Sequence, residues 1–392
     1  VQHCLYKSGV YAESLHRYKK GGYHSPILGD FLKDGRYKIM HKLGWGGYST
    51  VWAAQDRRDE TYVAIKISTS KTETNKPTLE FETVRQLASI DHRPRHVIQL
   101  LDNFDLQGPN GMHKCFVLEI LGPNVDDMVN FHTPDSRLPG KLAKIIAKQA
   151  LVGLDSLHRH KIGHGDLHTR NLAFTIPCTH GLPEERFMEL LSKPDIGKVT
   201  RNDGKPIDIG VPEYLIGHTL YRMESLSFNT IKIIDFGESF TLDQPPRNLN
   251  TPLAVRAPEI LFNDDLDHRV DLWAMGCMLF ELFVGQPPFD SLMSTPPMLA
   301  AQMQEMISDP LPVRWEDTWL EMRKEISPSS DPEIKLQEWL EELYFMSDRK
   351  AELSEDDIVQ LGGIIGKLLR FEPSTRASAK EIFNDPWFRD TS

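Results

Sequence analysis

Two carboxylates and an amide stand where phosphoryl-transfer chemistry needs them. Asp166 and Asn171 lie five residues apart in His-Gly-Asp-Leu-His-Thr-Arg-Asn, directly after a long predicted helix. In this spacing an aspartate accepts the proton of an attacking hydroxyl and an asparagine binds a metal ion. Asp235 opens an Asp-Phe-Gly sequence after the apolar run Ile231–Ile234, where a carboxylate can bind Mg²⁺ that bridges phosphates. The pattern predicts Asp166 as a catalytic residue, and Asn171 and Asp235 as metal ligands.

A glycine cluster and a lysine could hold the phosphates of a nucleotide. The glycines of Gly44–Val51 lie between two predicted strands and allow backbone N–H groups to approach phosphates closely. No Gly-Lys-Ser/Thr follows them, so the cluster is not a P-loop. Lys66 ends a later apolar run, from which a lysine reaches the α- and β-phosphates, and it joins Asp166 and Asn171 as a catalytic candidate. A carboxylate on the next helix should hold this lysine; Glu82 is the first choice and Glu80 the second.

These residues need a sheet to carry the glycines and helices to carry the carboxylates. Short apolar runs rich in β-branched residues predict strands at 37–40, 51–54, 62–67 and 115–119. Apolar residues spaced by three to four predict helices at 81–90, 142–157 and 272–283. The sequence therefore predicts an α+β fold with two lobes, a small antiparallel β-sheet lobe with one main helix and a larger, mainly helical lobe.

The expected boundaries divide the chain into three units. Residues 1–35 are an N-terminal extension, because they are polar and contain a Gly-Gly turn. Residues 36–121 are the first lobe, with the glycine cluster. Residues 122–392 are the second lobe, which begins at the Gly-Pro turn signal.

Two inserts are expected within the second lobe. A spacer rich in Pro and Gly covers about 175–230 and contains one short helix at 184–191. An acidic insert covers about 291–360, and residues 315–357 include 14 acidic and 5 basic residues. Such a charge run is usually a solvated face, although carboxylates in a groove would also steer a basic substrate.

Composition narrows the set of partners. Acidic residues outnumber basic ones by 56 to 45, a net charge of −11, which disfavours direct binding of nucleic acid. No apolar run approaches the roughly 18 residues of a membrane helix, so no membrane partner is expected. The four cysteines show no CxxC spacing, which favours a reducing compartment over a disulfide framework or a zinc site. Because the chain begins with Val1 rather than Met, its start is expected to be trimmed or processed.

Together these motifs resemble a eukaryotic-type protein kinase over roughly residues 36–390. Further sequences, and the long spacer, resemble the SR-protein kinase family, in particular its fungal members. Ala257-Pro258-Glu259 and Asp271-Leu272-Trp273 belong to the general kinase resemblance. The sequences that carry the resemblance to SR-protein kinases are Gly21-Gly22-Tyr23-His24, Leu28-Gly29-Asp30, Arg36-Tyr37, Lys42–Gly46 and Ser49–Trp52, and the fungal members share Asp-Leu-His-Thr-Arg-Asn at 166–171.

The resemblance implies an ATP- and Mg²⁺-dependent serine/threonine protein kinase that phosphorylates serines of basic Arg/Ser-rich, splicing-factor-like proteins. It implies a monomer that works in the cytoplasm and nucleus in the regulation of mRNA splicing.

The resemblance also implies the residues of the site. The adenine of ATP would contact the backbone of Glu119 and Leu121, with Leu118 behind it as the gatekeeper. Glu259 and Arg376 would form a buried ion pair that holds the activation segment. The residues expected around ATP are Leu43, Gly44, Trp45, Gly46, Gly47, Tyr48, Ser49, Thr50, Val51, Lys66, Glu82, Glu119, Leu121 and His168.

Two departures from the kinase pattern bear on activity. Gly165 stands where many kinases have an arginine that pairs with an activation-loop phosphate, and the segment 235–259 is short. We therefore expect activity without phosphorylation of this segment.

His168 stands where most protein kinases have a lysine near the transferring phosphoryl group. An unperturbed histidine is mostly neutral near pH 7, so slow chemistry is expected.

Two other functions stay open on the sequence. A pseudokinase scaffold is favoured by His168 and disfavoured by the presence of Lys66, Asp166, Asn171 and Asp235. A small-molecule phosphotransferase similar to the aminoglycoside kinases is favoured by His-Gly-Asp-Leu-His followed by Asn. The glycine cluster, Asp-Phe-Gly and Ala-Pro-Glu argue against that second alternative.

Overall fold

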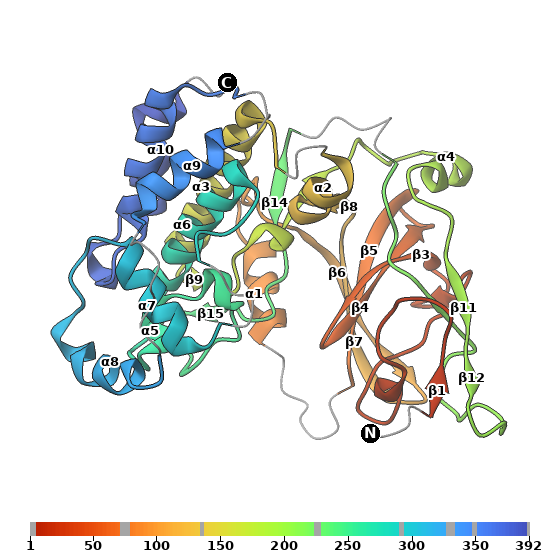
Figure 1. Cartoon of the computed structure of the whole chain (residues 1–392). Coiled ribbons are helices and arrows are strands. Elements are labelled where there is room, and N and C mark those ends of the chain that lie inside the picture. The colour runs from red at the N-terminus through yellow and green to blue at the C-terminus, as the bar shows by residue number, and fades with distance from the viewer. Residues whose placement is uncertain are drawn as a thin grey trace.

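An antiparallel sheet of six strands, in the order β2-β3-β4-β5-β7-β6, forms the smaller lobe (Figure 1). The structure is a computed structural model, and it describes residues 5–70, 79–133, 137–222, 229–289, 294–326, 334–346 and 351–389. The strands are β2 (Phe31–Leu32), β3 (Tyr37–Gly46), β4 (Ser49–Asp56), β5 (Thr61–Ser68), β6 (Leu100–Gly108) and β7 (Gly111–Glu119). The four strands predicted in this lobe are confirmed as β3, β4, β5 and β7. The prediction missed β6, an edge strand whose many polar residues obscure its pattern.

The main helix of this lobe, α1 (Leu79–Ala88), confirms the helix predicted near 81–90. Val84 and Leu87 lie three positions apart on its buried face and belong to the same apolar core as the larger lobe. Phe81 contacts the ring of Phe116 on β7, with 5.8 Å between the ring centroids. The helix therefore packs on the sheet and on the helical lobe at once.

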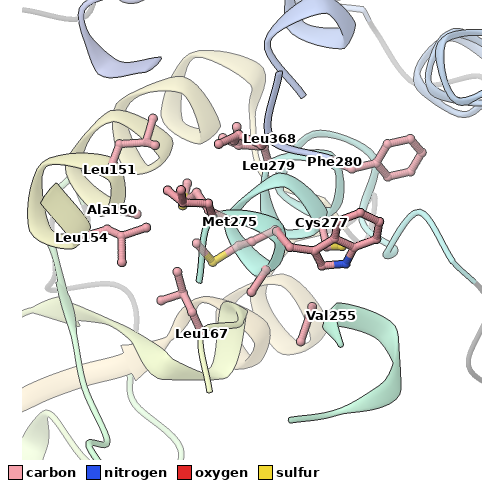
Figure 2. Packing of buried hydrophobic residues seen from close by; sticks show 14 of the residues in the cluster. Ala150, Leu151, Leu154, Leu167, Val255, Met275, Cys277, Leu279, Phe280 and Leu368 are labelled. Atoms are coloured by element: carbon pink, nitrogen blue, oxygen red, sulfur yellow. The ribbon is translucent and has the colours of Figure 1, made fainter. Parts of the chain in front are cut away.

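The larger lobe is built around α6 (Arg269–Val284), which is apolar on nearly all sides and buried. The long helix α3 (Gly140–Arg159) packs beside it, and Figure 2 shows Leu151 and Leu154 of α3 next to Met275 and Leu279 of α6. Both helices were predicted. The other helices are α2 (Val125–His132), α5 (Pro258–Leu261), α7 (Pro296–Met306), α8 (Glu316–Arg323), α9 (Leu336–Phe345), α10 (Glu355–Leu368) and α11 (Ala379–Phe383). In the described ranges, no helix is long and apolar enough to cross a membrane.

Short strands line the junction between the lobes. They are β8 (Leu121–Asn124), β9 (Ile162–Gly163), β10 (Leu172–Thr175), β14 (Ile231–Ile233) and β15 (Phe240–Thr241). The order β14-β10-β8 forms one small sheet, and β15 pairs with β9. These pairings bring the segments around residues 166 and 235 together.

The spacer is inserted between β10 and β14 of the junction, and it packs on the smaller lobe. Its elements are α4 (Glu184–Glu189), β11 (Ile196–Lys198), β12 (Thr200–Arg201) and β13 (Tyr214–Ile216). Figure 1 shows α4, β11 and β12 beside the six-stranded sheet. Phe187 of α4 stacks on Tyr62 of β5 with 3.8 Å between the centroids. Ile216 belongs to the apolar cluster of the sheet. The short helix predicted at 184–191 is confirmed as α4.

The N-terminal extension is paired with the spacer. Its strand β1 (Tyr6–Lys7) runs antiparallel to β12 of the spacer. Tyr18 and Tyr23 of the extension form an apolar cluster with Val199 and Leu215 of the spacer. We call residues 5–30 the arm, since they cross the smaller lobe as an irregular chain.

Candidate active site

The glycine hairpin is the turn between β3 and β4. Gly44 pairs with Val51 and Gly46 with Ser49, so the predicted segment Leu43–Val51 lies on two neighbouring strands and their turn. A Cβ atom placed on Gly46 would meet no atom within 4 Å. The hairpin thus leaves room for a ligand close to its backbone, as a phosphate-binding hairpin requires.

Lys66 connects the hairpin to Asp235, the predicted metal ligand. It lies on β5, directly opposite Val51 of the hairpin. Its ammonium nitrogen is 2.5 Å from Glu80 Oε1 and 2.8 Å from Asp235 Oδ1. The first choice of Glu82 as its partner is therefore wrong, and the second choice, Glu80, is correct.

The charges around Lys66 favour its ionised form. Burial alone lowers the pKa of Lys66, but the carboxylates of Asp235 and Glu80 raise it above its ordinary value. The charge of Lys66 lowers the pKa of Asp235 to about 2 against the effect of burial. Both groups are consequently charged at neutral pH, which suits a lysine for phosphate and an aspartate for a cation.

Asp166 is held in place from the centre of the larger lobe. Asp271, near the start of α6, accepts hydrogen bonds from the backbone N–H groups of His164 and Gly165, each at 2.8 Å. It also contacts His158 Nε2 at 3.0 Å. Burial would raise the pKa of Asp271, but His158 and the backbone donors keep it below its ordinary value. A buried, charged carboxylate therefore fixes the loop just before Asp166. No pattern in the sequence indicated this role for Asp271.

Asn171 and His168 lie beside Asp166. The Asn171 amide nitrogen donates to the Asp166 backbone oxygen at 2.7 Å and to its carboxylate at 3.2 Å. His168 Nε2 is 3.5 Å from the same carboxylate and 3.3 Å from the Asn171 amide nitrogen. Asp166 Oδ1 is buried and has no hydrogen-bond partner among the described atoms. An unsatisfied acceptor at this point fits a group that takes the proton of a substrate hydroxyl.

Asn171 and Asp235 meet at the ends of paired strands. Leu172 of β10 pairs with Ile233 of β14, and the Ile234 N–H donates to the Asn171 carbonyl at 2.9 Å. Because the Asn171 nitrogen is used on Asp166, its amide oxygen is the atom available to a cation. A carboxylate and an amide oxygen are suitable Mg²⁺ ligands, and nucleotide phosphates and water complete such sites. Bound there, Mg²⁺ would neutralise the charge of the phosphates.

The segment predicted to contact adenine joins the two lobes. β7 ends at Glu119 and β8 begins at Leu121. The Glu119 carboxylate pairs with Lys232 of β14 at 2.5 and 2.7 Å. It also accepts the Gln99 N–H at 2.8 Å. The Leu121 carbonyl accepts the Tyr221 hydroxyl of the spacer at 2.8 Å. The Glu119 side chain is thus occupied, and the contact of its backbone with adenine, with Leu118 as gatekeeper, stays a prediction.

The activation segment, residues 235–259, is held by hydrogen bonds and an ion pair within itself and to the larger lobe. Thr251 donates to the Gly165 carbonyl at 3.0 Å, and the Asn250 side chain donates to Glu238 at 3.0 Å. Glu259 and Arg376 form the predicted ion pair through two contacts of 2.6 Å, with side chains 2% and 0% exposed. None of these contacts requires a phosphate.

Comparison with known proteins agrees with this geometry. The family model described as "Protein kinase domain" matches residues 37–177 and 221–388, and the stretch between these parts belongs to the spacer. A serine/threonine-protein kinase SRPK of Physarum polycephalum is 29% identical over 96% of this chain and 91% of its own length. Protein kinase dsk1 of Schizosaccharomyces pombe is 25% identical over 98% of this chain and 86% of its own.

Two further similarities are shorter or purely structural. Human SRSF protein kinase 3 is 37% identical, over 41% of this chain and 29% of its own length. A crystal structure of a kinase domain has a TM-score of 0.66 and 19% identity, and the match covers 93% of this chain and 98% of that one. The chain therefore belongs to the protein kinase domain family and is a serine/threonine protein kinase of the SR-protein kinase type.

Proposed function

We propose that the chain transfers the γ-phosphoryl group of ATP to serine residues of basic, Arg/Ser-rich proteins of the splicing-factor kind. The proposal is supported by a set of contacts in a chain related to SR-protein kinases: Lys66 pairs with Asp235, Asn171 donates to Asp166, and the N–H of Ile234, next to Asp235, donates to the Asn171 carbonyl. In this reaction the bond between the γ-phosphorus and the ADP oxygen breaks as the serine oxygen bonds to phosphorus. The serine proton passes to Asp166, and ADP leaves.

The charge of the molecule supports a basic substrate. The net charge is −11, and α8 of the acidic insert presents exposed carboxylates at Glu316, Asp317 and Glu321. Carboxylates on the larger lobe raise the local concentration of a cationic peptide and speed its association, with a strong dependence on salt. A preference for arginine rather than lysine would follow from the planar guanidinium group, which binds a carboxylate through two hydrogen bonds.

The two alternative functions are less well supported. A scaffold without catalysis has no need for the ion pair between Lys66 and Glu80 or for the unsatisfied Asp166 oxygen. A small-molecule phosphotransferase does not account for the glycine hairpin together with the Glu259–Arg376 pair of the activation segment.

A peptide kinase assay tests the proposal. Matched peptides carrying Arg-Ser, Lys-Ser or Ala-Ser repeats are incubated with ATP and Mg²⁺, and phosphate transfer is measured at low and high salt. We expect the Arg-Ser peptide to be phosphorylated fastest and the rate to fall as salt rises, while an Asp166→Asn variant is inactive. Equal rates on the three peptides would refute the substrate assignment, and no transfer to any protein or peptide would refute catalysis.

A further inference from the structure

The arm reaches the glycine hairpin from outside the ATP site. The Tyr23 hydroxyl donates a hydrogen bond to the Gly46 carbonyl at 2.7 Å. Tyr23 is 3% exposed and packs against Tyr18, with 5.5 Å between the ring centroids. A buried ring of this kind has few rotamers open to it, so its hydroxyl is a fixed donor to the backbone of the hairpin.

A second residue of the arm spans the tip of the hairpin. The Arg17 guanidinium lies 4.9 Å from the centre of the Tyr23 ring and 5.8 Å from the centre of the Tyr48 ring. Tyr48 is at the tip and is 75% exposed. Trp45, on the strand leading to the tip, meets the ring of Tyr11 edge-on at 5.6 Å. Three arm side chains thus contact successive parts of one hairpin, and each contact is a favourable cation–π, aromatic or hydrogen-bond contact.

The arm is anchored to the strand that carries the hairpin. The Lys42 ammonium on β3 pairs with Glu13 of the arm, and both side chains are 1% exposed. Lys42 also donates to the Ile216 carbonyl of the spacer at 3.1 Å. Breaking such a pair would leave a buried charge without its partner, so the arm, the spacer and β3 behave as one body. Tyr23 and Arg17 are therefore held in a fixed position relative to β3, the strand that leads into the hairpin.

We propose that Tyr23 and Arg17 are positioning residues for ATP, which hold the glycine hairpin in the conformation that accepts the nucleotide phosphates. A free hairpin with several glycines must lose backbone freedom when a ligand binds to its N–H groups. A hairpin already held from outside loses less, so nucleotide binds more tightly. The proposal rests on the nucleotide site of the proposed function, but it assigns a role to residues that touch no substrate.

The test is a pair of matched substitutions. Tyr23→Phe removes the hydroxyl bonded to Gly46. Tyr62→Phe removes a hydroxyl that donates to the Leu182 carbonyl of the spacer at 3.0 Å, from an equally buried ring away from the hairpin. The measurements are the KM for ATP, the KM for peptide, kcat, the Kd for Mg²⁺–ADP by calorimetry, and the melting temperature.

We expect Tyr23→Phe to raise the KM for ATP and the Kd for Mg²⁺–ADP about fivefold, the effect of one net hydrogen bond. Its KM for peptide should stay unchanged, and Tyr62→Phe should bind nucleotide like the wild type at a comparable melting temperature. Arg17→Met should also weaken Mg²⁺–ADP binding. Unchanged nucleotide affinity in Tyr23→Phe, or equal weakening in Tyr62→Phe, would overturn the proposal. A wild-type chain that binds no Mg²⁺–ADP would overturn the nucleotide site itself.

Discussion

Glu80 Oε1 lies 2.5 Å from the ammonium nitrogen of Lys66. The contact holds Lys66 at the point where it also meets Asp235, so the two carboxylates share one cation. We expect Glu80→Gln to lower kcat/KM for ATP by about a hundredfold, because a small displacement of a positioning group has effects of that size. Glu82→Gln is the matched control, since it makes the same change two residues along α1 and should stay near wild type. Similar losses in both variants would contradict the assignment of Glu80.

The sequence did not determine whether Glu80 or Glu82 pairs with Lys66. Residues two apart on a helix point about 200° apart, so an error of one or two positions in placing α1 exchanges the partner of Lys66. Asp166, Asn171 and Asp235 were predictable because the chemistry fixes both their types and their spacing. No comparable spacing rule applies to the glutamate that holds the lysine.

The arm and the spacer could not be placed from the sequence for a different reason. Their contacts join segments far apart in the chain, such as Glu13 with Lys42 and Tyr6 with Arg201. These segments are short and irregular, so no apolar periodicity marks which surface they cover. Of the arm residues that contact the hairpin, only Tyr23 belongs to a motif of the family resemblance, and its contact with Gly46 had no signal in the sequence.

The activation segment should work without phosphorylation. Gly165 has a φ of +77°, and a Cβ there would lie 2.5 Å from the Glu238 carbonyl oxygen. The position that carries an arginine in many kinases therefore has no room for a side chain. We expect phosphatase treatment to leave kcat unchanged.

Substitution of Gly165 tests the same packing. Gly165→Ala should strongly lower kcat, because backbone strain and the clash with Glu238 both displace the loop before Asp166. Gly204→Ala is the control, since Gly204 has a φ of +74° with nothing within 4 Å of its added Cβ. If the two alanine variants lose activity equally, general strain explains the loss and the packing argument is wrong.

His168 is expected to limit the rate of phosphoryl transfer. Its Nε2 lies 3.5 Å from the Asp166 carboxylate, the group that we propose accepts the serine proton. A lysine at this position would place a fixed positive charge beside the charge that develops in the transition state. We expect His168→Lys to raise kcat several-fold, measured with the same peptide and ATP for both proteins. Equal kcat values for the two proteins would show that the charge at position 168 does not limit the rate.

Acid should destabilise the fold through His24 of the arm, which packs against His113 of β7. Burial, with a smaller effect of His113, lowers the pKa of His24 to about 4, and the two rings lie 5.1 Å apart. Below about pH 6.5 the unfolded chain gains a proton here that the folded chain does not accept. Stability is therefore complete above that pH and falls towards pH 4, by about 2 kcal/mol at pH 5 for this one group.

The variant His24→Phe separates this effect from other titrations. It keeps an aromatic ring and removes the titrating group, so its melting temperature should fall less than that of the wild type between about pH 7 and 5. His92→Phe, at an exposed position, should follow the wild type. The inference fails if His24→Phe is as sensitive to acid as the wild type.

The ion pair between Glu259 and Arg376 should make a large contribution to the free energy of unfolding. Arg376→Met leaves the Glu259 carboxylate, whose side chain is 2% exposed, without its cation, and the expected loss is about 3–5 kcal/mol of unfolding free energy. Lys367→Met breaks a more exposed pair with Asp385, with side chains 55% and 20% exposed, and should cost less than about 1 kcal/mol. Urea unfolding measures the free energy of unfolding of both variants.

A double variant with apolar residues at both 259 and 376 should recover part of the stability lost in Arg376→Met, because the buried charge is then removed together with its partner. If the double variant is less stable than Arg376→Met, the cost comes from lost packing rather than from an unpaired charge.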